Sequence, residues 1–255
     1  MSRLRSLILI MIAEVALCDA VRAASPLPQT FETGGVKLAY VEAGKGSTVV
    51  LIHGLHASAM LNWQLVGVFD ALAEHHHVVA LDLPGHGNSD KPEKDEAYGE
   101  QLAADVVALL DHLKVEKAHL VGYSLGGMVA IKTAVKYPKK IESLCVCGMG
   151  WLQSGGIPDK LEERMPSLTL LGVPKACVRN MNKLAVTEAE LKAIKIPAEI
   201  VVGADDALKK IFVEPLTRVR KDWPLVEIPG AGHITCVAKP EFKEELLRWT
   251  AARTK

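Results

Sequence analysis

The sequence predicts an α/β fold in which helices cover both faces of a mainly parallel β-sheet. Short apolar runs rich in β-branched residues alternate along the chain with longer segments of helical spacing. Such runs are typical of parallel strands buried on both faces. One of them leads through a glycine-rich turn directly into an apolar helix, a connection typical of this class. The 49% hydrophobic content of the 255 residues is ample for a sizeable core.

The expected elements follow one another in chain order. Strands are expected at residues 36–42, 48–52, 78–83, 118–123, 141–147, 200–202 and 226–228. The first alternates in the manner of an exposed strand, whereas the others are short and apolar. Helices are expected at residues 61–74, 101–113, 128–135, 208–219 and 240–252. Ligand sites in such a sheet lie beyond the carboxyl ends of the strands, so functional residues should follow strands directly.

One stretch, residues 149–196, breaks the alternation. It carries the turn-forming sequences Gly155-Gly156-Ile157-Pro158 and Gly172-Val173-Pro174 between short helical pieces. The stretch is too long for an ordinary connection between two elements. We therefore expect a single domain over residues 24–255, with a small helical lid inserted at about 149–196 between two strands of the sheet.

The first 23 residues differ in character from the rest of the chain. Arg3 and Arg5 precede an apolar run from Leu7 to Ala13, and small residues near Ala23 offer a cleavage point. This pattern resembles a secretory signal peptide and predicts export, to the periplasm or out of the cell. The alternative is an uncleaved N-terminal helix on a cytoplasmic or membrane-anchored protein. The apolar run is shorter than the ~20 residues that span a bilayer, so no stable span is expected in the mature chain.

Charge and cysteine content argue against several classes of function. Lysine plus arginine and aspartate plus glutamate number 30 each, and no basic run is present. A nucleic-acid-binding protein would carry a basic patch, so nucleic acid is not an expected partner. The five cysteines form no C-x-x-C pair and show no zinc spacing, so no metal site is expected. The oligomeric state stays open.

The most specific motif is Gly122-Tyr123-Ser124-Leu125-Gly126, which lies between an expected strand and an expected helix. It has the G-x-S-x-G pattern of a nucleophile elbow, a strained turn that lifts a serine hydroxyl above the sheet edge. The flanking glycines let the chain turn without Cβ clashes. Ser124 is therefore the predicted nucleophile. The backbone N–H of Leu125, directly after it, is a predicted donor to the oxyanion.

A serine nucleophile needs a base within hydrogen-bond reach, and the base needs an acid that fixes its tautomer. The strongest base is His233, because the glycine-rich loop 228–232 leaves a strand and can carry an imidazole over the sheet edge. Two carboxylates, Asp205 and Asp206, follow directly after another expected strand. Only one of them is needed.

These motifs resemble those of the α/β-hydrolase superfamily, and the resemblance covers nearly the whole chain after the leader. In that family the acid usually lies three residues after the strand-end glycine, which selects Asp206 and leaves Asp205 as the alternative. The implied order Ser124, Asp206, His233 is the family's chain order. Some relatives carry the acid after the preceding strand, but residues 147–151 offer no carboxylate, which excludes that variant here.

The same resemblance implies the second half of the oxyanion hole. The sequence His53-Gly54-Leu55-His56 follows an expected strand and is similar to the family's His-Gly-x motif. By that similarity the backbone N–H of Leu55 is the second oxyanion donor, and His53 is structural.

The predicted activity is hydrolysis of a carboxylic ester through an acyl-enzyme, with no metal or organic cofactor. Serine at the elbow argues against haloalkane dehalogenases and epoxide hydrolases, which resemble this chain but use aspartate there. A C–C bond hydrolase and a cofactor-free perhydrolase would use the same triad and are alternatives. A non-catalytic ligand-binding protein on this fold is an alternative from a different class.

The lid should set the range of substrates. Because it has fewer than fifty residues, it favours a small or medium apolar ester as the small-molecule partner. Most of its apolar side chains are expected to form its own core. Trp151 and Met165 are predicted to contact the substrate.

Overall fold

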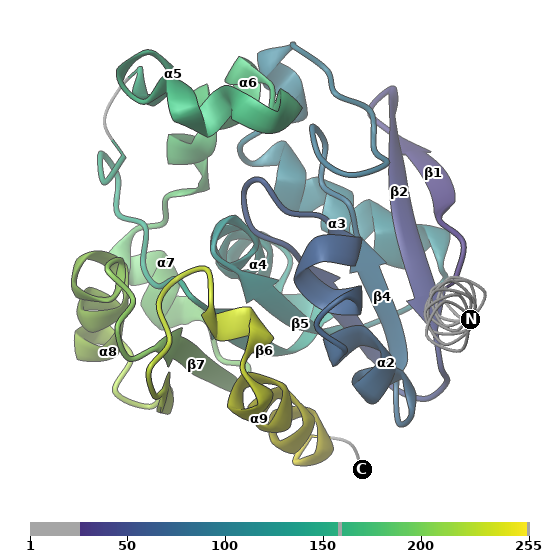
Figure 1. The fold of residues 1–255 in the computed structure, drawn as a ribbon, viewed down its shortest axis with the longest axis vertical. Helices are drawn as coiled ribbons and strands as arrows, with labels where there is room; N and C mark the ends of the chain where they lie inside the picture. The colour runs from purple at the N-terminus through teal and green to yellow at the C-terminus, as the bar shows by residue number, and fades with distance from the viewer. Residues whose placement is uncertain (1–25, 158–159, 254–255) are drawn as a thin grey trace, which may run out of the picture.

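An eight-stranded sheet forms the centre of the molecule (Figure 1). The computed structural model describes residues 26–157 and 160–253. The strands are β1 (Gln29–Thr33), β2 (Val36–Ala43), β3 (Thr48–Ile52), β4 (His77–Leu81), β5 (Ala118–Tyr123), β6 (Ile141–Cys147), β7 (Ala198–Gly203) and β8 (Leu225–Ile228). They lie in the order β1-β2-β4-β3-β5-β6-β7-β8. Only the β1–β2 and β2–β4 pairs are antiparallel, which confirms the mainly parallel sheet.

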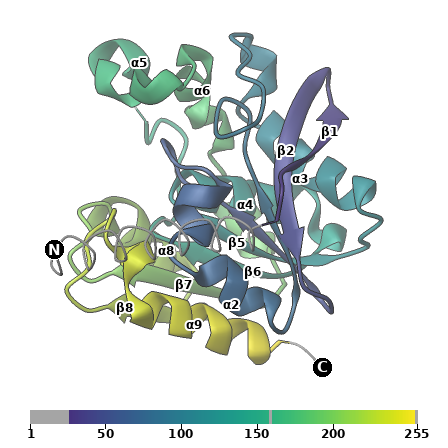
Figure 2. The ribbon, with the colours of Figure 1, turned by 45° about the vertical axis from the view of Figure 1, so that its right-hand side comes forward.

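Helices cover both faces of this sheet (Figures 1 and 2). The α-helices are α2 (Val68–Ala73), α3 (Gln101–His112), α4 (Leu125–Lys136), α5 (Leu161–Arg164), α6 (Lys175–Arg179), α7 (Glu188–Ala193), α8 (Glu214–Val219) and α9 (Pro240–Ala251). Short 3₁₀ or π segments are η1 (Met60–Gln64), η2 (Asp95–Ala97), η3 (Pro138–Lys140), η4 (Pro166–Gly172), η5 (Met181–Leu184), η6 (Lys209–Val213) and η7 (Cys236–Ala238). Helices α2 and α9 lie together on one face, and α3 and α4 lie together on the other.

Successive side chains of a strand enter different cores, because a strand presents alternate residues to opposite faces of the sheet. In β3, Val50 packs in the core beneath α3 and α4, whereas Leu51 packs in the core beneath α2 and α9. Both side chains are fully buried. Burial on both faces explains why this strand is an unbroken apolar run in the sequence.

The parallel register brings the carboxyl ends of several strands to one edge of the sheet. Ile52 at the end of β3 lies opposite Gly122 in β5, and Gly203 at the end of β7 lies opposite Ile228 at the end of β8. The segments that follow β3, β5, β7 and β8 therefore begin at the same edge, although they are far apart in the sequence.

Two local features differ from the sequence-based expectation. The edge strand β1 was not expected; it pairs with β2 through a turn at Gly34 and Gly35, both with positive φ. This pairing and the one with β4 bury most of β2, which was expected to be an exposed strand. The helix expected at 61–74 is broken at Gly67, whose φ of 70° is left-handed, into η1 and α2.

The predicted lid, residues 149–196, holds α5, η4, α6, η5 and α7 between β6 and β7. Figures 1 and 2 show α5 and α6 at the end of the molecule away from α9. Its role as a lid over the site stays a prediction. The predicted signal peptide, residues 1–23, lies outside the described residues. Within the described part of the chain, no helix is long and apolar enough to cross a membrane.

Candidate active site

Ser124 lies at the turn between β5 and α4 with a strained backbone, φ 52° and ψ −115°. Positive φ is costly for a residue with a Cβ and is a mark of a nucleophile elbow. The turn is anchored because the Ser124 N–H donates to the Cys147 carbonyl of the neighbouring strand β6 at 2.8 Å. No residue with a Cβ fits at either flanking glycine. A Cβ on Gly122 would lie 2.2 Å from the Gly126 oxygen, and one on Gly126 would lie 2.1 Å from the Ile52 oxygen.

His233 follows β8 and lies between the serine and a carboxylate. Its Nε2 is 2.9 Å from Ser124 Oγ, and its Nδ1 is 2.8 Å from Asp206 Oδ2. A carboxylate accepts hydrogen bonds, so Nδ1 carries the ring proton and Nε2 is free to accept from the serine hydroxyl. The backbone carbonyl of His233 also accepts a hydrogen bond from the Tyr123 hydroxyl, which fixes the loop against β5. The three side chains are thus joined in one chain of hydrogen bonds.

The two adjacent aspartates after β7 have different surroundings. Asp206 is buried, and its second carboxylate oxygen, Oδ1, accepts from the Leu208 N–H at 2.8 Å. Asp205 is exposed, and its backbone N–H donates to the Ala231 carbonyl. The geometry therefore pairs Asp206, and not Asp205, with the histidine.

The loop after β3 sits directly beside the nucleophile. A Cβ on Gly54 would lie 3.2 Å from the Ser124 Cβ, so only glycine allows this approach without displacement. The Gly54 carbonyl accepts from His53 Nδ1 at 2.8 Å and from the Ala57 N–H at 3.2 Å. In a trans peptide the N–H points opposite to the carbonyl, so the Leu55 N–H is directed away from these two donors. That amide makes no hydrogen bond to any other residue that the structure describes.

The second predicted oxyanion donor, the Leu125 N–H, is in the first turn of α4. The first four N–H groups of a helix have no partner within the helix. Leu55 and Leu125 both line the cavity that contains Ser124. Their placement is compatible with the predicted oxyanion hole.

His53 is a fully buried, neutral histidine. Its Nε2 accepts from the Leu83 N–H at 3.0 Å, so Nδ1 carries the proton that is donated to the Gly54 carbonyl. Burial lowers the pKa of His53 from 6.5 to about 4, which keeps the imidazole uncharged at neutral pH. The His86 ring lies 5.0 Å away between centroids. These contacts support a structural role for His53.

A cavity of about 710 Å³ opens over Ser124 and His233. Most of its wall is apolar and comes from three parts of the chain. The first part is the body of the domain, with Leu55, Leu61, Val66, Leu125 and Met128. The second is the 149–196 segment, with Ile157, Leu161, Leu168 and Met181. The third is residues 208–238, with Leu208, Phe212, Ile234 and Val237. Among the described residues, no lysine, arginine, aspartate or glutamate lines it.

The structure does not place the two predicted substrate contacts at this cavity. Trp151 is buried, and its indole N–H donates to the Val186 carbonyl at 2.8 Å. Its backbone N–H donates to the Phe212 carbonyl, so the residue joins the base of the 149–196 segment to η6. Met165 is half exposed and is not among the lining residues. Two polar lining residues, His56 and Asn62, were not predicted as site residues: His56 ends the His53-Gly54-Leu55-His56 loop but was given no role, and Asn62 lies in no motif.

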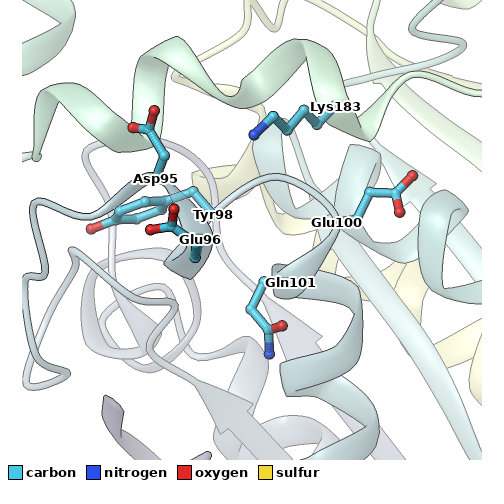
Figure 3. Close-up of a pocket in the computed structure, with 6 residues that line it drawn as sticks. All are labelled: Asp95, Glu96, Tyr98, Glu100, Gln101 and Lys183. Atoms are coloured by element: carbon cyan, nitrogen blue, oxygen red, sulfur yellow. The ribbon is translucent and has the colours of Figure 1, made fainter. Parts of the chain in front are cut away.

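A second hollow, of about 370 Å³, has a different character (Figure 3). It is lined by Asp95, Glu96, Tyr98, Glu100, Gln101 and Lys183. It contains no serine, cysteine or histidine, so nothing there matches a nucleophile and its base. Among the described residues, this hollow included, no three histidine, cysteine, aspartate or glutamate side chains are grouped so as to hold a metal ion.

Comparison with known proteins places the chain in a family. The sequence profile described as the alpha/beta hydrolase fold matches residues 47–175, about half of the chain. The chain belongs to this α/β-hydrolase family. The matched region includes the His53-Gly54-Leu55 loop and the elbow at Ser124, whereas Asp206 and His233 lie beyond it.

Two curated relatives match this chain over part of its length. The chain is 42% identical over 134 residues to the dihydrolipoyllysine-residue acetyltransferase component of the acetoin cleaving system of Pseudomonas putida. That match covers 51% of this chain and 35% of the relative, so the chain spans only about a third of that protein. A 2-hydroxymuconate semialdehyde hydrolase of Pseudomonas sp. strain CF600 is 28% identical over 192 residues, 72% of this chain and 65% of the relative.

Solved structures share the fold over most of the chain. A thermophilic esterase from Thermogutta terrifontis superposes with a TM-score of 0.73 and 23% identity, covering 91% of this chain and all of that one. A meta-cleavage product hydrolase from Pseudomonas fluorescens IP01 gives a TM-score of 0.71 and 21% identity over 88% of this chain and 97% of that one. At these identities the likeness shows the fold alone.

Proposed function

We propose that the protein is a serine hydrolase that cleaves neutral carboxylic esters through an acyl-enzyme. The observation that carries the proposal is the unbroken chain of hydrogen bonds from Asp206 through His233 to Ser124 at an elbow. Ser124 Oγ attacks the ester carbonyl carbon, and its proton moves to His233 Nε2. The buried carboxylate of Asp206 stabilises the imidazolium that forms.

The remaining steps follow from the same groups. The negative charge on the carbonyl oxygen is held by the backbone N–H groups of Leu55 and Leu125, which cost no reorganisation at the moment of reaction. His233 then returns its proton to the leaving alkoxide, so the alcohol departs and the acyl group stays on Ser124. Water, deprotonated by the same imidazole, attacks the acyl-enzyme and releases the acid.

The cavity wall favours an uncharged substrate. A carboxylate taken into an apolar cavity loses its hydration and needs a paired cation or several donors. No lysine or arginine lines this cavity among the described residues, and its polar side chains are limited to those of His56, Asn62, Tyr123, Ser124 and His233. A neutral ester makes no such demand.

A C–C bond hydrolase is the second candidate, because a relative at 28% identity over 72% of the chain is named a 2-hydroxymuconate semialdehyde hydrolase. The name of that substrate denotes a carboxylate. The same triad would serve such a reaction, but the cation-free wall gives the carboxylate no charged partner. This favours ester cleavage over the C–C bond reaction.

The test compares two esters of similar length, p-nitrophenyl butyrate and the hemisuccinate of p-nitrophenol, which differ by a terminal carboxylate. We expect kcat/KM to be at least about 10-fold higher for the neutral ester, because the buried charge is unpaired. A series of p-nitrophenyl esters of increasing acyl length then gives the size limit. The proposal would be overturned in favour of the second candidate by either of two results. One is faster turnover of the charged ester than of the neutral ester, and the other is faster turnover of 2-hydroxymuconate semialdehyde than of any ester.

A further inference from the structure

We propose that Asn62 is a positioning residue for the oxyanion hole, acting through the backbone of Gly54. The inference rests on the proposed function and adds a residue to its machinery. Any other residue at position 54 would bring its Cβ to 3.2 Å from the Ser124 Cβ and displace it by a few tenths of an ångström. Glycine is also the residue with the greatest backbone freedom. A donor peptide that begins at a glycine needs external contacts to hold its direction.

The structure supplies such contacts on both sides of Gly54. On the carbonyl side, His53 Nδ1 and the Ala57 N–H hold the oxygen. On the amide side, the Gly54 N–H donates to Asn62 Oδ1 at 3.1 Å. Because an N–H can donate only to the amide oxygen, this contact fixes which end of the Asn62 side chain faces Gly54. The Gly54–Leu55 peptide, which carries the Leu55 N–H, is thus held at its carbonyl, and the His53–Gly54 peptide before it is held at its N–H, so the two peptides on either side of the Gly54 Cα are both anchored.

Asn62 is also placed to hold its own position. It belongs to η1, is 5% exposed, and its backbone N–H donates to the Ser58 carbonyl at 2.9 Å. Its Nδ2, in contrast, is buried with no hydrogen-bond partner among the described residues. A buried unpaired donor is unfavourable, and an apolar side chain of similar size would avoid it. Asparagine at this position is therefore better explained by its contact with Gly54 than by packing.

The test uses two variants that remove the acceptor but differ in packing, Asn62→Leu and Asn62→Ala. We expect kcat of both to fall by about 10- to 100-fold, because a small misplacement of one donor weakens transition-state stabilisation. KM should change by less than about threefold. Asn180→Leu is the matched control, since Asn180 is equally buried and hydrogen-bonded but does not line the cavity; its kcat should stay at the wild-type value.

The decisive readout is affinity for a trifluoromethyl ketone, whose adduct with serine carries an oxyanion. Across the variants its inhibition constant should rise in proportion to the loss of kcat/KM, and independently of thermal stability. If the losses instead follow the melting temperature, or if the folded variants keep wild-type kcat, Asn62 is structural only and the proposal is overturned. If the enzyme kept its activity when Ser124 is replaced by alanine, the proposed function itself would be refuted, which is a separate outcome.

Discussion

Glycine is required at position 126 because a carbonyl group of a neighbouring strand lies close to its Cα. Adding a Cβ there would place it 2.1 Å from the Ile52 oxygen, and backbone atoms cannot move aside as a flexible side chain can. We expect Gly126→Ala to lower the free energy of unfolding by at least about 3 kcal/mol through overpacking, and to abolish activity. The measurement is urea-induced unfolding. Gly232→Ala, whose Cβ would meet nothing closer than 3.9 Å, is the control and should unfold like the wild type.

The two adjacent aspartates provide a second test on residues. Asp206→Asn removes the charge that stabilises the His233 imidazolium and should lower kcat by something on the order of 10²- to 10⁴-fold. Asp205→Asn should change kcat far less, because its side chain is exposed and is not paired with the histidine. Steady-state rates with p-nitrophenyl butyrate decide between them. A larger loss in the Asp205 variant would make Asp205 the acid of the triad.

At this scale the sequence predicted the residues whose chemistry depends on a local pattern. The elbow at Ser124 and the loop of His233 are contiguous signals, so both could be located without coordinates. The choice between Asp205 and Asp206 came only from a resemblance. Which of the two side chains faces His233 depends on the direction in which the backbone turns after β7, and the sequence does not show that direction. Asn62 could not be predicted, since its role depends on a contact with Gly54 across a folded loop.

Among the elements, α3 carries a buried carboxylate that has few hydrogen-bond partners. Asp105 is 2% exposed, and its hydrogen-bond partner is the Gln101 side chain at 2.8 Å. Burial raises the pKa of Asp105 from 3.8 to about 7. A carboxyl whose pKa is higher in the folded state destabilises the fold when ionised, so its cost is full above pH 7 and vanishes as the pH falls towards 4.

Asp105→Asn should therefore stabilise the protein in a pH-dependent way. We expect a gain of about 2–4 kcal/mol in the free energy of unfolding at pH 8, fading to nothing near pH 4, as measured by urea titration. Asp111→Asn on the same helix is the control; Asp111 is exposed, and the change should stay within about 1 kcal/mol at either pH. A gain for the Asp105 variant that is equal at both pH values would show that burial of the charge is not its cause.

Helices and strands that depend on local sequence were predicted, whereas those that depend on contacts with distant residues were not. Buried strands such as β3 and β5 are apolar runs and were located from composition alone. Strand β1 was missed because four of its five residues are polar and only pairing with β2 makes it a strand. The Gly34-Gly35 turn was the available signal. The break at Gly67 divides a continuous helical pattern, and nothing in the apolar spacing marks it.

For the molecule as a whole, the fold places four separate loops at one sheet edge, and the 149–196 segment adds an apolar wall above them. The sequence predicted this insertion but not which of its side chains face the cavity. Trp151 and Met165 were predicted to contact the substrate, yet Ile157, Leu161, Leu168 and Met181 line the cavity. Short helical pieces without a clear amphipathic period give no rule for the direction of their side chains.

Export remains a prediction for the whole chain. If residues 1–23 act as a signal peptide, protein purified from its native host should begin near Ala24 and have the mass of residues 24–255 within one or two residues. Intact-mass spectrometry makes this measurement. A full-length species confined to the cytosol would contradict it.

The proposed function requires that Ser124 be a nucleophile activated by His233 and Asp206. It is tested most directly by reaction with a fluorophosphonate probe followed by peptide mapping. We expect one adduct per chain, on Ser124, with complete loss of both labelling and esterase activity in Ser124→Ala while the thermal unfolding curve is unchanged. Undiminished labelling or ester hydrolysis in the folded Ser124→Ala protein would show that Ser124 is not the nucleophile.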